Sequence, residues 1–283
     1  QEQGKPLPEA QAEIAYTCAF IRHLAGYDLP VKVIEDNDNR LVRQFRKPLG
    51  VVGAIIPWNF PVLIVAFKLP LALLAGNTMV VKPAPTTPLT TLKLGEIIAE
   101  ILPPGVVNIV TDQNDLGPAL TAHPDVAKIS FTGSTATGQK IMASAASTIK
   151  RLTLELGGND AAIVLPGADP AKAAPGLFAG AFMNAGQVCL AIKRAYVHGS
   201  IYDEVCARLA ELAEAAVVGD GLQQGTTIGP LQNRMQFDKV KALLDSARAD
   251  GRIIAGGTLP DGPGYFIRPT IVADVADGHR IVD

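Results

Sequence analysis

The stretch Val51-Val52-Gly53-Ala54-Ile55-Ile56 decides the fold class, because it is a short run without a charged or polar side chain. A continuous apolar run of this length is typical of a strand that is buried on both faces of a sheet. The segment from Pro61 to Leu74 follows it and is apolar almost all round, which predicts a buried helix. The sequence therefore predicts a strand and its covering helix at the start of a parallel sheet.

The same alternation of strands and helices continues to Leu156. The further predicted strands are Thr78 to Val81, Val106 to Val110, Ala127 to Phe131 and Arg151 to Leu156, and the further predicted helices are Pro88 to Ile101, Leu116 to Ala122 and Ser134 to Ala146. This order indicates an α/β fold with a Rossmann-like parallel sheet that is covered on both faces. Because ligands of such sheets bind beyond the carboxyl ends of the strands, Asn59, Lys82 and Gly133 are of interest.

An amphipathic helix is predicted before the sheet, over residues 9–25. Ile14, Cys18, Ile21 and Ala25 recur in it at helical spacing, which places Cys18 in a core stripe. A packing role is therefore expected for this cysteine.

Residues 31–48 are expected to form a protruding β-hairpin. Val31 to Ile34 and Arg40 to Phe45 are strand-like runs, and Asp36 to Asn39 supplies turn residues between them. An isolated two-stranded hairpin is marginally stable in water. Two possibilities stay open: the hairpin contacts another subunit, or it packs on its own domain.

The α/β pattern restarts after Gly157-Gly158, which places a domain boundary there. The predicted strands of this second α/β domain are Asp160 to Leu165 and Ala195 to His198, and its predicted helices are Pro170 to Asn184, Tyr202 to Val217 and Phe237 to Ala249.

Composition excludes several classes of protein. The 283 residues include 25 basic and 27 acidic side chains, and a net charge of −2 speaks against binding to nucleic acid or to an anionic membrane surface. The most apolar run, Phe60 to Ala75, contains Lys68 and is too short to span a bilayer. No signal peptide is visible, although the chain begins without Met. A cytoplasmic location is expected.

Three cysteines without a CxxC motif argue against a disulfide framework or a zinc site, and they indicate a reducing compartment. Cys189 directly follows a Gly186-Gln187 turn, where the chain can present a thiol as a nucleophile. The alternative for Cys189 is a small buried apolar residue. Cys206 lies beside the apolar stripe of a predicted helix, which indicates packing.

Two polar side chains follow the first two strands. Asn59, within Pro57-Trp58-Asn59-Phe60-Pro61, is able to donate to a developing oxyanion, or it caps the next helix. Lys82 is placed to reach a ribose hydroxyl or a phosphate, or it is a solvated lysine at the end of a strand.

Two further candidates follow later strands. Gly133 and Ser134 open a helix whose N-terminus favours an anion, and an ordinary capped helix is the alternative. Glu155 faces away from the leucines of its own strand. It is a candidate general base toward water, or a charge on the solvated side of the strand.

In combination, these motifs resemble the aldehyde dehydrogenase superfamily over essentially the whole chain. The stretches that carry the resemblance are Pro57-Trp58-Asn59-Phe60-Pro61, Lys82-Pro83-Ala84, Phe131-Thr132-Gly133-Ser134, Leu154-Glu155-Leu156-Gly157-Gly158 and Gly186-Gln187-Val188-Cys189. Their order and separations also fit the family.

The resemblance implies NAD(P)-dependent oxidation of an aldehyde to a carboxylic acid. Cys189 would be the nucleophile, giving a thiohemiacetal and then a thioester. The Asn59 side chain and the Cys189 backbone N–H would form the oxyanion hole, and Glu155 would activate the hydrolytic water.

The resemblance also implies the sites of the cofactor, which is NAD or NADP. Lys82 would hold the adenosine ribose, Gly133 and Ser134 would lie along the pyrophosphate, and Pro57 and Trp58 would line the cofactor site. No metal is implied.

The domains take their expected roles from the same resemblance. Residues 1–30 and 49–156 would form a nucleotide-binding domain, and 157–283 would form a catalytic domain. The hairpin at 31–48 would be an oligomerisation arm of a homodimer or homotetramer.

Two departures from the family matter. The family often carries a glutamate three residues after the lysine, but this chain has Pro85 at that position, from which we hypothesise that NADP is tolerated. The family also extends beyond both ends of this sequence. We therefore expect an incomplete chain that binds cofactor poorly and turns over little.

Two rivals remain. One is a CoA-acylating aldehyde dehydrogenase, in which CoA resolves the thioester, although Glu155 argues against it. The other is a non-catalytic relative that keeps the fold as a binding or structural protein.

Overall fold

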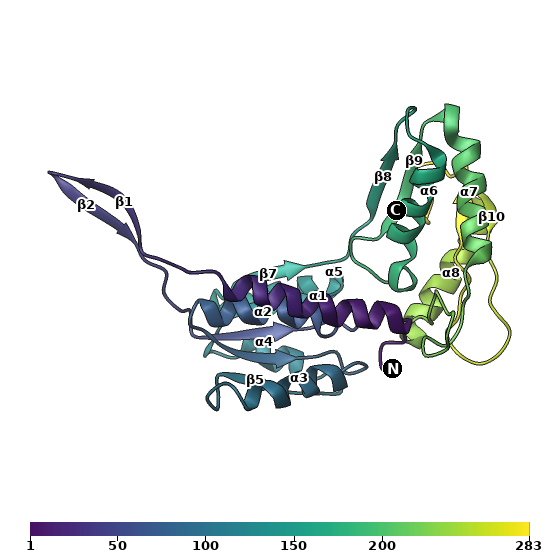
Figure 1. The fold of residues 1–283 in the computed structure, drawn as a ribbon. Helices are drawn as coiled ribbons and strands as arrows, with labels where there is room; N and C mark the ends of the chain where they lie inside the picture. The colour runs from purple at the N-terminus through teal and green to yellow at the C-terminus, as the bar shows by residue number, and fades with distance from the viewer. Residues whose placement is uncertain (283) are drawn as a thin grey trace. The chain divides into compact units, whose positions relative to one another are not determined.

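A parallel five-stranded sheet forms the centre of the first compact unit, Gln11–Leu156, in the computed structural model, which describes residues 1–282. Its strands are β3 (Val51–Ile55), β4 (Thr78–Lys82), β5 (Val107–Ile109), β6 (Val126–Thr132) and β7 (Arg151–Glu155). They lie in the order β5-β4-β3-β6-β7 and are all parallel (Figure 1). The predicted Rossmann-like α/β fold is confirmed. The chain order reverses between β3 and β6, which makes this place a topological switch point.

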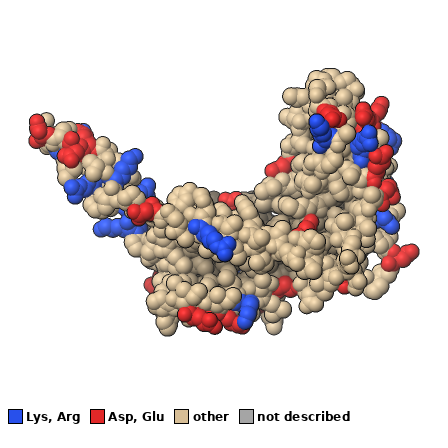
Figure 2. Space-filling model, in the orientation of Figure 1, with Lys and Arg blue, Asp and Glu red and all other residues tan. Residues whose placement is uncertain are grey.

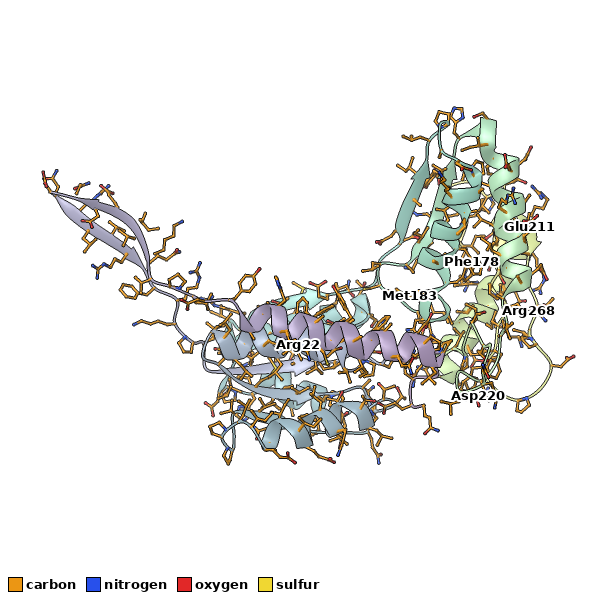
Figure 3. All side chains as sticks on the ribbon, in the orientation of Figure 1. Arg22, Phe178, Met183, Glu211, Asp220 and Arg268 are labelled. Atoms are coloured by element: carbon orange, nitrogen blue, oxygen red, sulfur yellow. The ribbon has the colours of Figure 1, made fainter. Side chains whose placement is uncertain are left out.

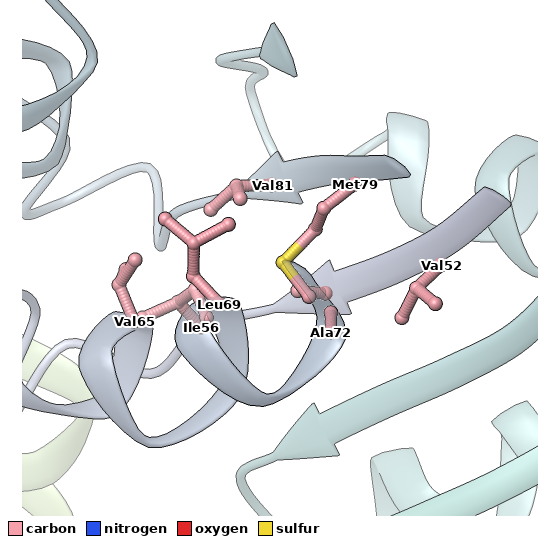
Figure 4. Packing of buried hydrophobic residues seen from close by; sticks show 8 residues of the cluster. Val52, Ile56, Val65, Leu69, Ala72, Met79 and Val81 are labelled. Atoms are coloured by element: carbon pink, nitrogen blue, oxygen red, sulfur yellow. The ribbon is translucent and has the colours of Figure 1, made fainter. Parts of the chain in front are cut away.

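Helices cover both faces of this sheet. They are α2 (Leu63–Leu74), α3 (Leu89–Ala99), α4 (Leu116–Ala122) and α5 (Thr135–Ala145). Figure 4 shows Val65 and Leu69 of α2 directed at Met79 and Val81 of β4. Within residues 1–282, no helix is both long and apolar enough to cross a membrane.

The continuous apolar run of β3 follows from this double cover. Val52 and Ala54 belong to the cluster beneath α2, whereas Ile55 packs with Ile129 in the cluster on the other face. At Gly53, an added Cβ would lie 2.8 Å from Ile129 Cδ1, so a larger residue would require the Ile129 side chain to shift.

The predicted core stripe of the first helix is wrong. In α1 (Leu7–Ala25), Ile14 is 47% exposed and Cys18 is exposed, whereas Glu13 is buried. The Glu13 Oε1 atom accepts hydrogen bonds from the backbone N–H groups of Val62 and Leu63, both at 3.2 Å. The buried face of α1 therefore carries a carboxylate that caps α2, and apolar periodicity does not reveal such a face.

The predicted hairpin is confirmed as the antiparallel pair β1 (Lys32–Asn37) and β2 (Arg40–Gln44). Asn37 Oδ1 accepts the backbone N–H of Asn39 at 2.9 Å and that of Arg40 at 3.1 Å, which stabilises the turn. Figure 2 shows Lys and Arg side by side with Asp and Glu over this hairpin. Nearly all of its side chains are exposed.

The second compact unit contains Gln1–Ala10 and Gly157–Asp283. Its elements are the parallel pair β8 (Asp160–Val164) and β9 (Ile192–Val197), the helices α6 (Pro170–Phe182), α7 (Tyr202–Ala215) and α8 (Arg234–Asp250), and the antiparallel pair β10 (Arg252–Ala255) and β11 (Ile271–Ala273). β9 begins at Ile192, earlier than predicted, because Lys193 and Arg194 interrupt its apolar pattern. Its pairing with β8 nevertheless starts at Ile192 and resumes at Arg194 after a register shift at Lys193.

Candidate active site

Four neighbouring strands bring the predicted site residues of the first unit to one edge of its sheet. Lys82 ends β4, Pro57-Trp58-Asn59 follows β3, Gly133-Ser134 follows β6, and Glu155 ends β7. The parallel register keeps the ends of these strands level. The edge includes the switch point between β3 and β6, which is where doubly wound sheets bind ligands.

Asn59 does not cap the helix that follows it. α2 begins at Leu63, and the capping carboxylate is that of Glu13 on α1. The Asn59 Oδ1 atom instead accepts the backbone N–H of Phe60 at 3.1 Å. The helix-cap alternative is therefore wrong, and the turn after β3 holds the Asn59 amide at the switch point.

Gly133 and Ser134 form the start of α5. The Gly133 N–H donates to the Glu155 carbonyl at 3.0 Å, and Ser134 Oγ accepts the Thr137 N–H at 3.3 Å as the N-cap of α5. The ordinary cap that the sequence allowed is present. It does not exclude an anion, because a helix N-terminus beside a switch point is also a favourable place for a phosphate.

Lys82 is not a solvated lysine, so this alternative is also wrong. The Lys82 side chain is 4% exposed, and its Nζ lies 2.7 Å from Asp112 Oδ1. The Asp112 side chain is fully buried. Burial on its own would raise the pKa of Asp112, but hydrogen bonds from Lys82 and the Leu116 N–H hold this pKa below its ordinary value. Asp112 follows β5 and was missed in the sequence, because nothing in the local pattern connects it to Lys82.

Lys68 is a second charged residue that sequence reasoning missed as a site residue. It lies on the buried face of α2, and its Nζ donates to Ser130 Oγ at 3.1 Å. Burial lowers the pKa of Lys68 to about 8. The negative charge of Glu155 opposes this shift, and the positive charge of Lys128 adds to it. Its available signal was a charged residue inside an otherwise apolar helix.

Glu155 has the orientation that alternation predicted. Leu152 and Leu154 pack into the core on one face of β7, and Glu155 is exposed. Its negative charge favours the charged form of Lys68 and so opposes the lowering of the Lys68 pKa by burial.

Cys189 follows an unusual turn in the second unit. Asn184, Ala185 and Gly186 have φ values of 52°, 55° and 75°, so three consecutive residues are left-handed. Figure 3 shows Met183 at the start of this turn, beyond Phe178 on α6. A left-handed alanine is strained, which means that surrounding contacts must hold the turn in place.

Buried hydrogen bonds to Asn184 hold this turn. Asn184 is 1% exposed, and its Oδ1 accepts from Gln3 Nε2 at 2.8 Å. Its backbone N–H donates to the Glu9 carboxylate at 3.1 Å. Gln187 Nε2 donates to the Asn184 carbonyl at 2.9 Å, and Gln187 Oε1 accepts the Gln232 N–H at 2.9 Å. The segment that leads to Cys189 is therefore fixed from both sides.

Cys189 itself is exposed, so the buried-cysteine alternative is wrong. Lys193 is exposed overall, but its Nζ turns back over the loop and donates to the carbonyl oxygens of Val188 and Cys189 at 3.2 and 3.3 Å. Partial burial lowers the pKa of Lys193, and the charges of Asp160 and Cys189 oppose this. A fixed, accessible thiol beside an ammonium group is a suitable arrangement for a nucleophile.

A glycine permits the chain to pass close to this loop. At Gly158, an added Cβ would lie 2.6 Å from the Cys189 carbonyl oxygen and 2.6 Å from Asp160 Oδ1. The Asp160 side chain is able to move away, but the Cys189 carbonyl belongs to the backbone and is not, which explains a glycine at this crossing.

The other two cysteines lack this setting. Cys18 lies exposed on α1. Cys206 is half-buried on α7, where burial raises the pKa of its thiol although a hydrogen bond from Tyr202 opposes the shift. Cys206 also lines an apolar cavity of about 800 Å³ between α6, α7 and α8, to which Cys189 does not contribute.

Known proteins resemble the chain over its whole length. The chain is 46% identical to a probable aldehyde dehydrogenase of a Pseudomonas species, over 96% of this chain and 56% of that protein. Two solved structures superpose with high scores: the NAD⁺ complex of an aldehyde dehydrogenase from Bacillus cereus (38% identity, TM-score 0.95) and an NADP-dependent enzyme from E. coli (40% identity, TM-score 0.94). Both superpositions include 99% of this chain. They include 58% of the B. cereus chain and 60% of the E. coli chain.

The chain thus spans less than two thirds of the length of these relatives. The family model described as "Aldehyde dehydrogenase family" matches residues 1–283. Because this match includes every residue of the sequence, the chain belongs to the aldehyde dehydrogenase family.

Proposed function

We propose that the protein oxidises an aldehyde to a carboxylic acid with NAD or NADP, and that Cys189 is the nucleophile. The observation that carries this proposal is the strained but fixed turn that presents an exposed Cys189 beside the Lys193 ammonium. Family membership supports aldehyde oxidation as the reaction class.

The residues of the cofactor site fit a dinucleotide. The N-terminus of α5, with Gly133 and Ser134, offers backbone N–H groups to a pyrophosphate at the switch point. Lys82 lies at the end of the neighbouring strand for a ribose, and Pro57 and Trp58 follow β3. When bound, NAD or NADP supplies a nicotinamide ring that accepts a hydride.

In the proposed reaction, Cys189 Sγ bonds to the aldehyde carbon and gives a thiohemiacetal. The Asn59 amide and the Cys189 N–H donate to the developing oxyanion. Loss of a hydride from the same carbon, together with release of the hydroxyl proton to solvent, leaves a thioester on Cys189. Glu155 then takes a proton from water, which attacks the thioester and releases the acid and the thiol.

Steady-state kinetics of the full chain with a panel of aldehydes tests this proposal. We expect slow formation of reduced cofactor and of an equal amount of carboxylic acid, because the chain spans less than two thirds of the length of its relatives. Cys189→Ser is expected to abolish both products. Cys18→Ser is the matched control, because it removes another exposed thiol, which lies outside the site. Binding of nucleotide without turnover by any aldehyde would favour the non-catalytic alternative, and an acyl-CoA product would favour the CoA-acylating one.

We also propose that the β1–β2 hairpin joins subunits of a homodimer or homotetramer. Ile34 and Leu41 are 54% and 50% exposed on it, and such apolar side chains favour a partner surface. Sedimentation of Ile34→Ser/Leu41→Ser against the unchanged chain tests this: the substitutions are expected to lower the mass of the particle. Three free cysteines are consistent with the proposed cytoplasmic location.

A further inference from the structure

The carboxyl end of β4 is the place where this sheet would read the adenosine ribose. In doubly wound sheets, the end of the strand next to the first one carries an acidic residue for the ribose 2′-hydroxyl or a cation for a 2′-phosphate. Here β4 lies beside β3, on the side away from β6, and it ends at Lys82. Position 85 is an exposed proline, so the loop after β4 supplies no carboxylate there.

A carboxylate nevertheless reaches this place from the next strand. Asp112, three residues beyond the end of β5, contacts Lys82 Nζ at 2.7 Å. Its side chain is fully buried, and its other oxygen accepts the Leu116 N–H at 3.0 Å. These contacts fix the carboxylate next to the ammonium, and they favour its charged form.

The donors of Lys82 are then almost fully used. An ammonium group has three N–H donors. One is directed at Asp112 Oδ1, and a second reaches the Pro83 carbonyl at 3.3 Å. Within residues 1–282, the third N–H has no partner. Lys82 therefore has one donor left for a ligand, and its charge is already neutralised.

We infer that Asp112 makes the protein select NAD over NADP, by neutralising Lys82 and leaving it one hydrogen-bond donor. This inference rests on the proposed function, because it takes the edge of the sheet as the cofactor site. One N–H donor is sufficient for a ribose hydroxyl oxygen. A 2′-phosphate carries roughly two negative charges and would lie close to the Asp112 carboxylate. Because Lys82 is already paired with Asp112, no unpaired cation would offset this repulsion.

The inference reverses what Pro85 alone indicated. Absence of a carboxylate at position 85 led to the hypothesis that NADP is tolerated. The structure shows that a negative charge at this strand end does not have to come from the loop after β4. Asp112 is a positioning residue, since it acts through Lys82.

Binding is measured on the full chain through fluorescence of Trp58, the single tryptophan, which lies beside the switch point. The ligands are NAD, NADP, and their fragments 5′-AMP and 2′,5′-ADP. We expect the unchanged protein to bind NAD and 5′-AMP at least about tenfold more tightly than their 2′-phosphorylated counterparts, because like charges placed together are costly.

Asp112→Asn is expected to narrow this ratio about tenfold, since it keeps the shape of the side chain and restores the charge of Lys82. Asp115→Asn is the matched control, because it removes an exposed carboxylate from the same loop and should leave the ratio unchanged. A merely structural role of Asp112 would weaken all four ligands alike.

If Asp112→Asn does not fold, the binding ratio of the unchanged protein still tests the inference. Equal or tighter binding of NADP and 2′,5′-ADP by the unchanged protein would overturn the inference and leave the cofactor site standing. An unaltered ratio in folded Asp112→Asn would do the same. Failure of all four ligands to bind would overturn both the cofactor site and the inference.

Discussion

The Nζ atom of Lys68 donates to Ser130 Oγ over 3.1 Å, from the buried face of α2 to β6. One neutral hydrogen-bond partner does not compensate for the loss of water around an ammonium group. Lys68 therefore has a lowered pKa of about 8, and Glu155 is the nearby charge that opposes the shift.

Glu155→Gln is expected to lower the pKa of Lys68 further. The substitution removes the attraction that favours the charged ammonium and leaves the burial unchanged. A titration of the lysine side chains by NMR measures the midpoint. Glu96→Gln on α3 is the control, because Glu96 is exposed and pairs with Lys93. An unchanged midpoint in Glu155→Gln would mean that the two groups do not interact.

Lys68 should also make stability depend on pH. Its pKa is about 8 in the folded chain, against an ordinary value of 10.5. Between these values the unfolded chain binds more protons, so stability rises with pH there, and the unfavourable contribution of Lys68 is full only below about pH 8.

Lys68→Met should therefore flatten the stability profile. The free energy of unfolding of the unchanged chain is expected to rise about 2 kcal/mol more between pH 7 and pH 10 than that of the variant. Urea unfolding at both pH values measures this difference. Parallel profiles for the two proteins would show that Lys68 is not desolvated.

Removal of the α2 cap should destabilise the first unit. Glu13→Ala leaves the Val62 and Leu63 N–H groups without their carboxylate, which is expected to cost about 1–2 kcal/mol. Glu13→Gln keeps an acceptor and should cost less. Gln11→Ala on the exposed side of α1 is the control. Urea midpoints rank the three variants, and equal midpoints would contradict the capping role.

The three cysteines should differ in alkylation by iodoacetamide. Cys189 is expected to react fastest because it is exposed next to an ammonium group, and Cys206 slowest because burial raises the pKa of its thiol. Peptide mass spectrometry gives each rate. Lys193→Met should slow the reaction of Cys189, whereas Lys172→Met, at an exposed position on α6, should not. Faster reaction of Cys206 than of Cys189 would remove the reason for naming Cys189 as the nucleophile.

The sequence predicts those features that repeat along one element. Continuous apolar character identifies β3 as a strand buried on both faces, and strict alternation separates Leu154 from Glu155 on β7. Both were confirmed because burial of a regular element imposes its own period on the sequence. Motif order then pointed to one edge of the sheet, where Asn59, Lys82, Gly133 and Glu155 lie at the ends of four successive strands.

Contacts between polar residues that are far apart in the chain were not predictable in this way. Asp112 meets Lys82, and Glu13 caps α2, through side chains that belong to different elements. Gln3 reaches Asn184 over 181 positions. A single polar residue in an element produces no periodic pattern. The helical spacing of Ile14 and Cys18 therefore predicted the wrong buried face of α1, and the buried residue Glu13 was missed.

The β8–β9 sheet has a practical consequence for handling the protein. Within residues 1–282, each of these strands pairs only with the other, so both outer edges present unpaired backbone groups. Ile163 on β8 and Leu165 directly after it are 74% and 67% exposed. Strand edges of this kind pair readily with strands of other molecules, so we expect the protein to aggregate when it is concentrated. A charged residue beside such an edge opposes this pairing, and Ile163→Lys is therefore expected to improve solubility. Light scattering against protein concentration shows whether Ile163→Lys raises the threshold.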